Sequence, residues 1–443
     1  MSISLVLLVF VRQLFSYLTV NTRSNTIRDS QGQPIKELKQ DARLLKFISS
    51  LELSNMGKEL ADDKPYIIQN GRCRELVVTQ PDHLRDFYGK DTKDHPKPAN
   101  LNMGEYFGRI LGDAAGVQVG ERWKIIRKYF DPEFAHGISM QALEKFSCQI
   151  HVWADALQTT PAGFKTSPEN DENHGFIVDL TKSMKFLPFK LVALQMYGEA
   201  FTEELYDELL DINNLHVQIL HDVIGNKKLA SKLGNWLPSA AKNRMDLYLN
   251  RWRSFNLDII QRARDNNLSC PVERIYRGVD HNREMKQTEF LHTLDEILFA
   301  NVDVSSAVLN TMFSQLAATP AFQAALRTEI LQWKKDTPDD KNMTRYISKQ
   351  DTLLNFAIME SMRLTPAFWF SLPECTAAAK MIGGYSIPPN MPVVIDARRL
   401  NTESATWGDD GRVFRPERFS TISQTQSFIY GTQVNLENQL DIN

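Results

Sequence analysis

The sequence has few cysteines and no grouping of them that builds a site. The 443 residues contain four, and none forms a Cys-x-x-Cys pair or has a histidine at zinc-binding spacing. They are Cys73, Cys148, Cys270 and Cys375. This scatter argues against a disulfide framework and a zinc centre, and we expect free thiols in a reducing compartment. The chain is long enough to bury a sizeable core without such staples, as one large domain or as two to three smaller ones.

A large excess of either charge sign is also lacking. The 51 Lys and Arg residues nearly balance the 54 Asp and Glu residues, which leaves a formal net charge of −3. A nucleic-acid-binding chain normally carries a basic surplus. We therefore expect no nucleic-acid partner.

Long apolar runs are missing after residue 20, and the run before it is imperfect. Residues 2–20, SISLVLLVFVRQLFSYLTV, are apolar except for Arg12-Gln13 and short hydroxyl residues. A spanning helix needs about 20 apolar residues, and an arginine near its centre costs roughly 2.5–3.5 kcal/mol. No basic stretch precedes the run and no clear cleavage site follows it, which argues against a signal peptide. A membrane-spanning helix and an interfacial helix both remain open.

A helix that contains a charged pair is predicted within residues 351–370, DTLLNFAIMESMRLTPAFWF. Its apolar residues recur at helical spacing, and Pro366 should end it near Leu364. Glu360 and Arg363 are three residues apart and share one face of this helix. Taken alone, such a pair is a surface ion pair worth roughly 0–1 kcal/mol.

The sequence downstream gives this pair a more specific interpretation. A β-rich stretch follows the helix, and then comes Pro416-Glu-Arg-Phe419. A Glu-x-x-Arg helix followed by this tetrapeptide resembles the cytochrome P-450 family of haem-thiolate monooxygenases. The resemblance implies a mainly α fold with small β-sheets. It also implies that Glu360, Arg363 and Arg418 form a buried triad that braces the haem-binding core.

A second stretch fits the same family. Residues 120–130, GERWKIIRKYF, place Trp123 and Arg127 four residues apart on one helix face. The residues alone predict a core tryptophan with the arginine stacked on its ring. The resemblance implies that both bind a haem propionate, a role that suits the planar guanidinium fork of arginine.

One long helix is predicted over residues 287–319, QTEFLHTLDEILFANVDVSSAVLNTMFSQLAAT, which end before Pro320. It is apolar on much of its circumference, so we expect it to run through the core. Asn301 and Asp303 lie in its middle. Because buried polar groups are costly unless they are paired, the residues alone predict a polar seam or a kink there.

The resemblance gives this segment a catalytic role. The central helix of the family carries a small residue, Gly, any residue, an acid and Thr over the haem iron, where the acid and the alcohol relay protons. Ala300 and Asp303 match this pattern, whereas Asn301 replaces the glycine and Val304 replaces the threonine. We expect Asp303 to relay protons, Ala300 to lie against the haem, and Ser305 to supply the hydroxyl.

The end of the sequence departs from the family. A loop of the form F-x-x-G-x-x-x-C-x-G should follow, with a cysteine as the axial iron ligand. Phe428-Ile-Tyr-Gly431 begins this loop, but no cysteine follows Cys375, so we expect no metal ligand in this sequence. Glu374 also stands where many members have an arginine for a propionate. The resemblance covers roughly residues 30–431, without the cysteine loop and the final helix.

The resemblance implies haem b as cofactor and the insertion of one oxygen atom from O2 into a small organic substrate. Electrons would come from NADPH through NADPH–cytochrome P-450 reductase. The segments SLPECT, VVIDARRLN and DPEFAHG are similar to those of filamentous-fungal members that make secondary metabolites such as mycotoxins. We expect an anchor at residues 1–20 in the endoplasmic reticulum membrane and a single cytosolic domain at 21–443. The alternative is a non-catalytic, truncated relic or decoy of the same fold.

Overall fold

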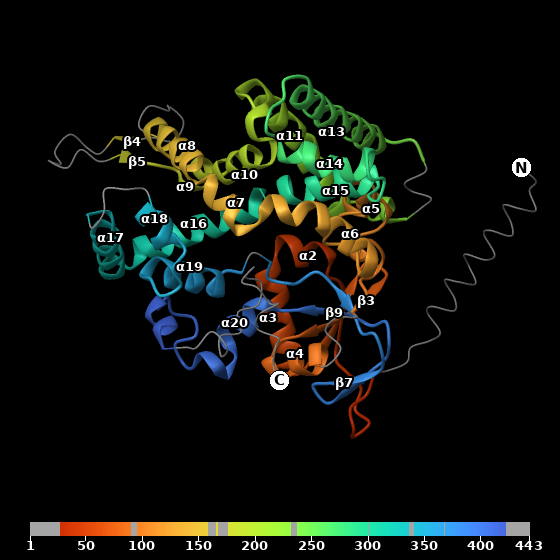
Figure 1. Cartoon of the computed structure of the whole chain (residues 1–443). Helices are drawn as coiled ribbons and strands as arrows, with labels where there is room; N and C mark the ends of the chain where they lie inside the picture. The colour runs from red at the N-terminus through yellow and green to blue at the C-terminus, as the bar shows by residue number, and fades with distance from the viewer. Residues whose placement is uncertain are drawn as a thin grey trace, which may run out of the picture.

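The structure is a computed structural model. It describes eight segments, namely residues 27–89, 95–157, 165–166, 176–231, 237–300, 302–335, 341–366 and 368–421. The apolar segment 2–20, Asn301 and the motif at 428–431 lie outside the described residues. Within these segments the chain is mainly helical with small β-sheets, as the sequence predicted (Figure 1).

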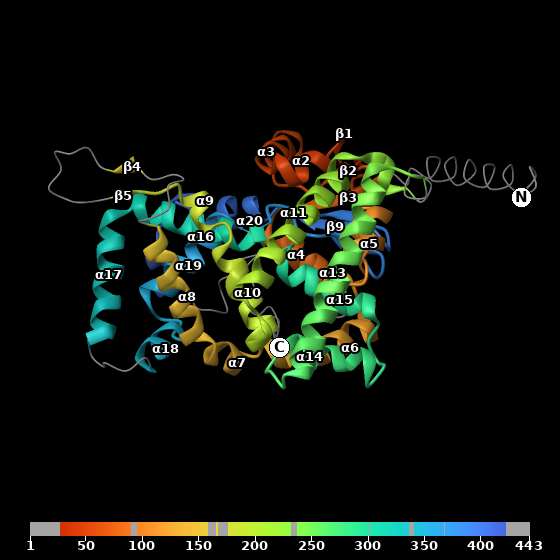
Figure 2. The same ribbon diagram turned by 90° about the horizontal axis from the view of Figure 1, so that it is seen from above.

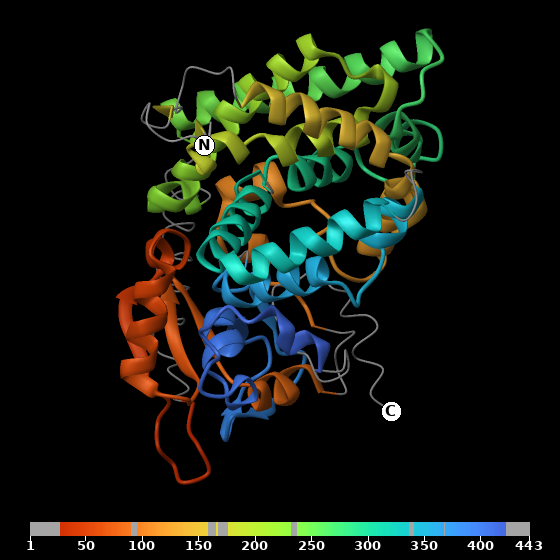
Figure 3. The same ribbon diagram turned by 90° about the vertical axis from the view of Figure 1, so that its left-hand side faces the viewer.

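The largest sheet joins the two ends of the described chain. Its strands, in spatial order, are β1 (Glu37–Asp41), β2 (Tyr66–Asn70), β3 (Cys73–Val78), β9 (Pro392–Ile395) and β6 (Glu374–Cys375). β2 and β3 form an antiparallel hairpin, and Gly71 takes the left-handed φ of 63° in its turn. β3 pairs in parallel with β9, so the red and blue parts of the chain lie side by side in Figure 3.

Two smaller sheets consist of one antiparallel pair each. β7 (Lys380–Ile382) pairs with β8 (Tyr385–Ile387), and β4 (Lys165–Thr166) pairs with β5 (Phe176–Ile177). The turn between β7 and β8 is made by Gly383 and Gly384, both at positive φ. Together with β9, β7 and β8 make up the β-rich stretch that follows the Glu-x-x-Arg helix.

Helices make up most of the rest of the described chain. They are α2 (Arg43–Ile48), α3 (Ser50–Ala61), α4 (Pro81–Tyr88), α5 (Glu105–Leu111), α6 (Gly120–Phe130), α7 (His136–Gln141), α8 (Leu143–Ala156), α9 (Leu180–Met184), α10 (Leu187–Tyr197), α11 (Glu203–Gly225), α13 (Ala240–Asp265), α14 (Pro271–Asp280), α15 (Gln287–Leu298), α16 (Val302–Ala318), α17 (Pro320–Lys335), α18 (Lys341–Ile347), α19 (Leu353–Leu364) and α20 (Ala397–Glu403). Short 3₁₀ turns connect them, among them η2 (Ala99–Asn102), η3 (Asp131–Phe134), η4 (Gly198–Ala200), η5 (Lys227–Ala230), η6 (Ala405–Trp407) and η7 (Pro416–Ser420).

The largest core lies among the helices between α5 and α15. α11 and α13 pack against each other, and α14 and α15 lie next to them (Figure 2). Aromatic rings fill the contact with the central helix: Trp252 on α13 meets Phe299 edge-on, with 4.8 Å between ring centroids. The long amphipathic helices of this region therefore bury their apolar faces against one another rather than against the sheet.

The helix predicted over 287–319 is distorted in its middle, where the residues alone predicted a polar seam or a kink. The N–H groups of Phe299 and Ala300 both donate to the Asp295 carbonyl, at 2.8 and 3.2 Å, and the Val302 N–H donates to the Phe299 carbonyl at 3.3 Å. Bonds that reach back five and three residues replace the regular four-residue pattern, which distorts the helix. α15 is buried, but on α16 only Val302, Ser306 and Leu316 are buried, so the predicted core position holds for the first half alone.

Among the residues that the structure describes, the stretch Gln287–Ala318 is long and apolar enough to cross a membrane by length and composition. A core helix meets the same criterion, and α15 lies inside the protein with seven buried residues.

Candidate functional site

The structure brings Glu360, Arg363 and Arg418 together. Arg363 donates from Nε and Nη2 to the two carboxylate oxygens of Glu360, both at 2.7 Å. Arg418 donates from Nε to Oε1 of the same carboxylate at 3.1 Å. The Arg363 and Glu360 side chains have no exposed surface, and Arg418 has 4%. The sequence placed the first two on one helix face, but only the fold shows that the pair is buried.

The remaining donors of the two arginines hold the segment before Pro416 in place. Arg363 donates to the Asn401 and Gly411 carbonyls, and its guanidinium lies 4.6 Å from the Trp407 ring centroid. Arg418 donates to the Asp410 carbonyl at 3.2 Å. Such a network adds little stability relative to an apolar core of the same size, but the loss of one partner leaves a buried charge uncompensated. The triad therefore fixes η7 against α19.

The structure places Trp123 and Arg127 on the same face of α6. The Arg127 guanidinium lies 5.2 Å from the Trp123 ring centroid, so the predicted stacking is present, but Trp123 is half-buried and not the core residue that was predicted. Its Nε also pairs with Asp131 at 2.5 Å, and its side chain is 44% exposed. The pair is therefore partly exposed on α6 in this structure.

A second arginine ties α6 to the central helix. Arg122 donates from Nε to Oε1 of Glu289 at 2.7 Å and pairs with the other oxygen through Nη2. Glu289 is almost fully buried in the first turn of α15, where it also accepts the Lys286 N–H. This bidentate pair sets the position of α6, and hence of Trp123 and Arg127. The sequence analysis did not single it out.

The exposure of the central helix changes at its distortion. Ala300 is half-buried against the helical core, whereas Asp303, one turn further on, is exposed. α16 packs against α9, α10, α17 and α19, whereas α6 packs against α14 and η3. The helix of Trp123 and Arg127 therefore packs against different elements from those that contact the helix of Asp303.

The expected pair of an acid and an alcohol is not formed by Asp303 and Ser305. The two lie two positions apart in a regular helix, so their side chains point to different sides. Ser306 is closer in angle to Asp303, but it is buried and its hydroxyl donates to the Val302 carbonyl at 3.0 Å. A hydroxyl that is bonded to its own helix is a common helical arrangement.

A haem group would need carboxylate-binding donors, an apolar face and an axial ligand. Trp123 and Arg127 offer an indole N–H and a guanidinium fork that fit a propionate carboxylate. The small Ala300 beside the helix distortion fits the approach of a flat ring. These residues thus match the group except at the ligand, for which the four cysteines are no candidates by motif.

Two of the four cysteines, Cys270 and Cys375, are buried in the structure. Cys375 is buried in β6, and burial raises the pKa of its thiol to about 11, which keeps it protonated at neutral pH. Burial also raises the pKa of Cys73 and Cys270. No group of three or more His, Cys, Asp or Glu side chains in the described segments is arranged to hold a metal ion.

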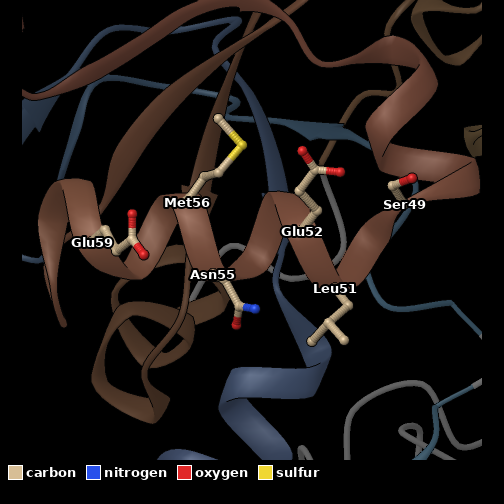
Figure 4. Close-up of a pocket in the computed structure, with 6 residues that line it drawn as sticks. All are labelled: Ser49, Leu51, Glu52, Asn55, Met56 and Glu59. Carbon is tan, nitrogen blue, oxygen red and sulfur yellow. The ribbon is translucent and has the colours of Figure 1, made fainter.

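A surface depression along α3 offers no comparable chemistry. Figure 4 shows its lining residues spread along one helix: Ser49, Leu51, Glu52, Asn55, Met56 and Glu59. Most of these side chains are exposed, and the two carboxylates lack a cationic partner among the lining residues. The depression therefore does not supply a candidate site.

A set of polar residues on α15 was not predicted from the sequence. His292, Thr293, Asp295 and Glu296 lie among the apolar residues of the second half of this helix, and the first three are buried. Asp295 accepts a hydrogen bond from the Tyr248 hydroxyl and lies 2.9 Å from Nε2 of His216. Consecutive polar residues in a helix predicted to cross the core were the available signal.

Comparison with known proteins places the whole arrangement in one family. A family model described as Cytochrome P450 matches residues 58–431. Cytochrome P450 monooxygenase apdB of Emericella nidulans is 49% identical over 436 residues, which cover 94% of this chain and 83% of that protein. Cytochrome P450 monooxygenase opdB of Penicillium oxalicum is 44% identical, over 91% of this chain and 78% of that protein. Cytochrome P450 monooxygenase lepD of Aspergillus flavus is 40% identical, over 89% and 76%.

The matched range contains α6, the distorted central helix and the buried Glu360–Arg363–Arg418 network, which are the features that the resemblance in sequence pointed to. The family implies a haem iron and oxidoreductase chemistry. This chain belongs to the cytochrome P450 family of haem-dependent monooxygenases.

Proposed function

We propose that the chain binds haem b and inserts one oxygen atom from O2 into a small organic substrate in fungal secondary-metabolite biosynthesis. The observation that carries the proposal is the distortion of the central helix at Phe299–Val302, beside Ala300 and Asp303. Departures from regular helix of this kind occur frequently at functional sites. The fungal relatives that are named as monooxygenases support the reaction class.

The bound haem would supply the activation of oxygen. On the protein side, we assign the binding of a propionate to Trp123 and Arg127. The Arg127 guanidinium already holds the Asp131 carboxylate, so a propionate would replace or share that partner. Arg122, through its buried pair with Glu289, would keep α6 at the distance that this contact requires.

We assign the handling of protons to Asp303. Its carboxylate is exposed on the first turn of α16, where it can take up a proton from water and release it on the side of the helix that Ala300 occupies. Ser305 is the proposed hydroxyl. Because it points away from Asp303, its participation requires a bridging water. The Glu360 triad takes no part in proton transfer and holds η7.

The proposed electron donor is NADPH, through a membrane-bound cytochrome P450 reductase. We propose that residues 1–20 anchor the chain in the endoplasmic reticulum membrane, with residues 21–443 as one cytosolic domain. The length and apolar character of segment 2–20 support this anchor.

The test is to express the complete chain together with a reductase and measure haem per polypeptide. To find the substrate, metabolite extracts of the source organism with and without the gene are compared. The substrate is the compound that accumulates when the gene is absent. The expected result is about one haem per chain and an NADPH-dependent product heavier by one oxygen atom. A chain that folds but retains no haem would refute the proposal and favour the non-catalytic relic or decoy.

A further inference from the structure

The distorted turn of the central helix contains none of the residues that usually bend a helix. Residues 295–304 read DEILFANVDV, without proline or glycine, and these two are the common local causes of a kink. The irregular bonds meet at Asp295, whose carbonyl accepts the N–H groups of both Phe299 and Ala300. A bond that reaches back five residues is of the π-helical type. Because the local sequence does not impose this turn, contacts with other helices have to hold it.

The side chain of Asp295 is held by two other helices. The Tyr248 hydroxyl on α13 donates to one carboxylate oxygen, and Nε2 of His216 on α11 lies 2.9 Å from the other. The side chain of His216 has no exposed surface, that of Asp295 has 1%, and Tyr248 is fully buried. Burial, together with the neighbouring Asp295, raises the pKa of Tyr248 well above its usual value, so its hydroxyl stays a donor.

The ring of Phe299 fixes the next turn of α15 against the same helices. Its centroid lies 4.8 Å from that of Trp252 on α13 and 5.2 Å from that of His216. Phe189 on α10 adds a third ring at 5.9 Å. Asp295 and Phe299 are four residues apart and therefore share one face of the helix. Both ends of the turn from which the distortion starts are thus fixed by α11 and α13.

The helix is less enclosed beyond the distortion. Seven of the twelve residues of α15 are buried, whereas α16 buries three residues of its seventeen. α16 also packs against a partly different set of neighbours, among them α9, α17 and α19. Asp303, the proposed group for proton transfer, lies in the first turn of this second half. Its position relative to Ala300 therefore depends on how firmly the first half is held.

We propose that His216, Tyr248 and Asp295 are positioning residues that hold the distortion of the central helix in place. The three side chains thereby set where Asp303 stands relative to Ala300. They act through the helix and take no part in proton transfer themselves. The role rests on the proposed monooxygenase function. When the network is loosened, α16 can shift, and NADPH is then consumed without transfer of oxygen to the substrate.

Two tyrosine variants test the hold on the helix. Tyr248→Phe removes the hydroxyl that bonds Asp295 and keeps the ring. Hydrogen exchange of peptides covering 296–303, measured on the complete haem-loaded chain, should quicken roughly tenfold or more, the equivalent of one hydrogen bond to a charged group. Peptides covering α19 should keep the wild-type rate, which shows that the change is local.

Tyr276→Phe is the matched control, because the Tyr276 hydroxyl accepts a hydrogen bond from Gln287 at the other end of α15. We expect this variant to leave the exchange of peptides covering 296–303 unchanged. Unchanged exchange in Tyr248→Phe as well would overturn the proposal, because the network would then not hold the distorted turn.

The ratio of product formed to NADPH consumed tests the effect on the reaction, with the compound that accumulates without the gene as substrate. A loss of folded enzyme lowers both quantities alike, whereas a misplaced Asp303 lowers the ratio. We expect the ratio to fall several-fold in Tyr248→Phe and to stay at the wild-type value in Tyr276→Phe. Faster exchange with an unchanged ratio would overturn the positioning role. A wild-type chain that forms no product would refute the proposed function and this role with it, while the exchange result would still decide whether the network holds the helix.

Discussion

Replacement of Asp396 by asparagine tests how strongly burial acts on one carboxyl group of the sheet region. Asp396 directly follows β9, is fully buried, and caps the N-terminus of α20. One carboxylate oxygen accepts the Arg399 N–H at 3.0 Å, and the other accepts the Ser54 hydroxyl at 2.7 Å. Burial nevertheless raises the pKa of Asp396 to about 6. Asparagine keeps the acceptor for Arg399 and presents an amide to the Ser54 oxygen, which can also accept.

The size and the sign of the effect follow from this pKa. A rise from 3.8 to about 6 is roughly two units, or about 3 kcal/mol at 1.36 kcal/mol per unit. Because the folded state has the higher pKa, it binds the proton more tightly than the unfolded state. This contribution to the free energy of unfolding is complete below pH 3.8 and is lost as the pH rises through about 6. Between roughly pH 4 and 7, wild type should lose about 3 kcal/mol relative to Asp396→Asn.

Urea unfolding followed by circular dichroism measures this difference across that pH range. The test compares the free energies of unfolding of Asp396→Asn and wild type at each pH. The difference, variant minus wild type, should increase as the pH rises. The exposed Asp258 on α13 provides the matched control, because its replacement by asparagine makes the same change to a carboxylate at the surface of the protein. Parallel curves for wild type and Asp396→Asn would refute the reasoning.

Four further predictions concern the site. Glu360→Ala should lower the free energy of unfolding by about 3–5 kcal/mol, since two buried guanidinium groups lose their partner, whereas the exposed Glu417→Ala should change it little in the same denaturation assay. Arg127→Ala should lower the haem content of the purified chain, and an unchanged haem spectrum would remove Arg127 from propionate binding. Asp303→Asn should lower kcat more than it weakens substrate binding, and equal activity would exclude it from proton transfer. Deletion of residues 1–20 should move the protein from the membrane pellet to the soluble fraction, and retention in the pellet would exclude this segment as the sole tether.

Several elements could be predicted from the sequence because they depend on local chemistry. Asn70-Gly71 favours the turn of the β2–β3 hairpin, because glycine tolerates the left-handed backbone there. Pro366 predicted the end of α19 near Leu364, where the structure ends it. The family also followed from sequence, because short motifs at fixed spacing carry it. Each of these inferences depends on residues that are neighbours in the chain.

The features that were missed depend on distant parts of the chain. β1 was not predicted, since its five residues gain their place only by parallel pairing with β2. A kink in the central helix was one of the two arrangements predicted for this segment, but the sequence did not decide between a kink and a polar seam. The hydrogen bonds from the Asp113 and Gly116 N–H groups to side chains on α15 join residues 179 and 180 positions apart in the chain.

The sequence by itself therefore determined the family, the helical class and the chemical identity of the site residues, because these lie in local pattern and composition. Tertiary structure decided which charges are buried and what they hold. Glu360 and Arg363 look like a surface pair in sequence, and Arg127 like a partner for buried groups, yet the first pair is fully enclosed and the Arg127 side chain is 44% exposed. Burial is set by what the rest of the chain packs around a side chain, and no local pattern contains that information.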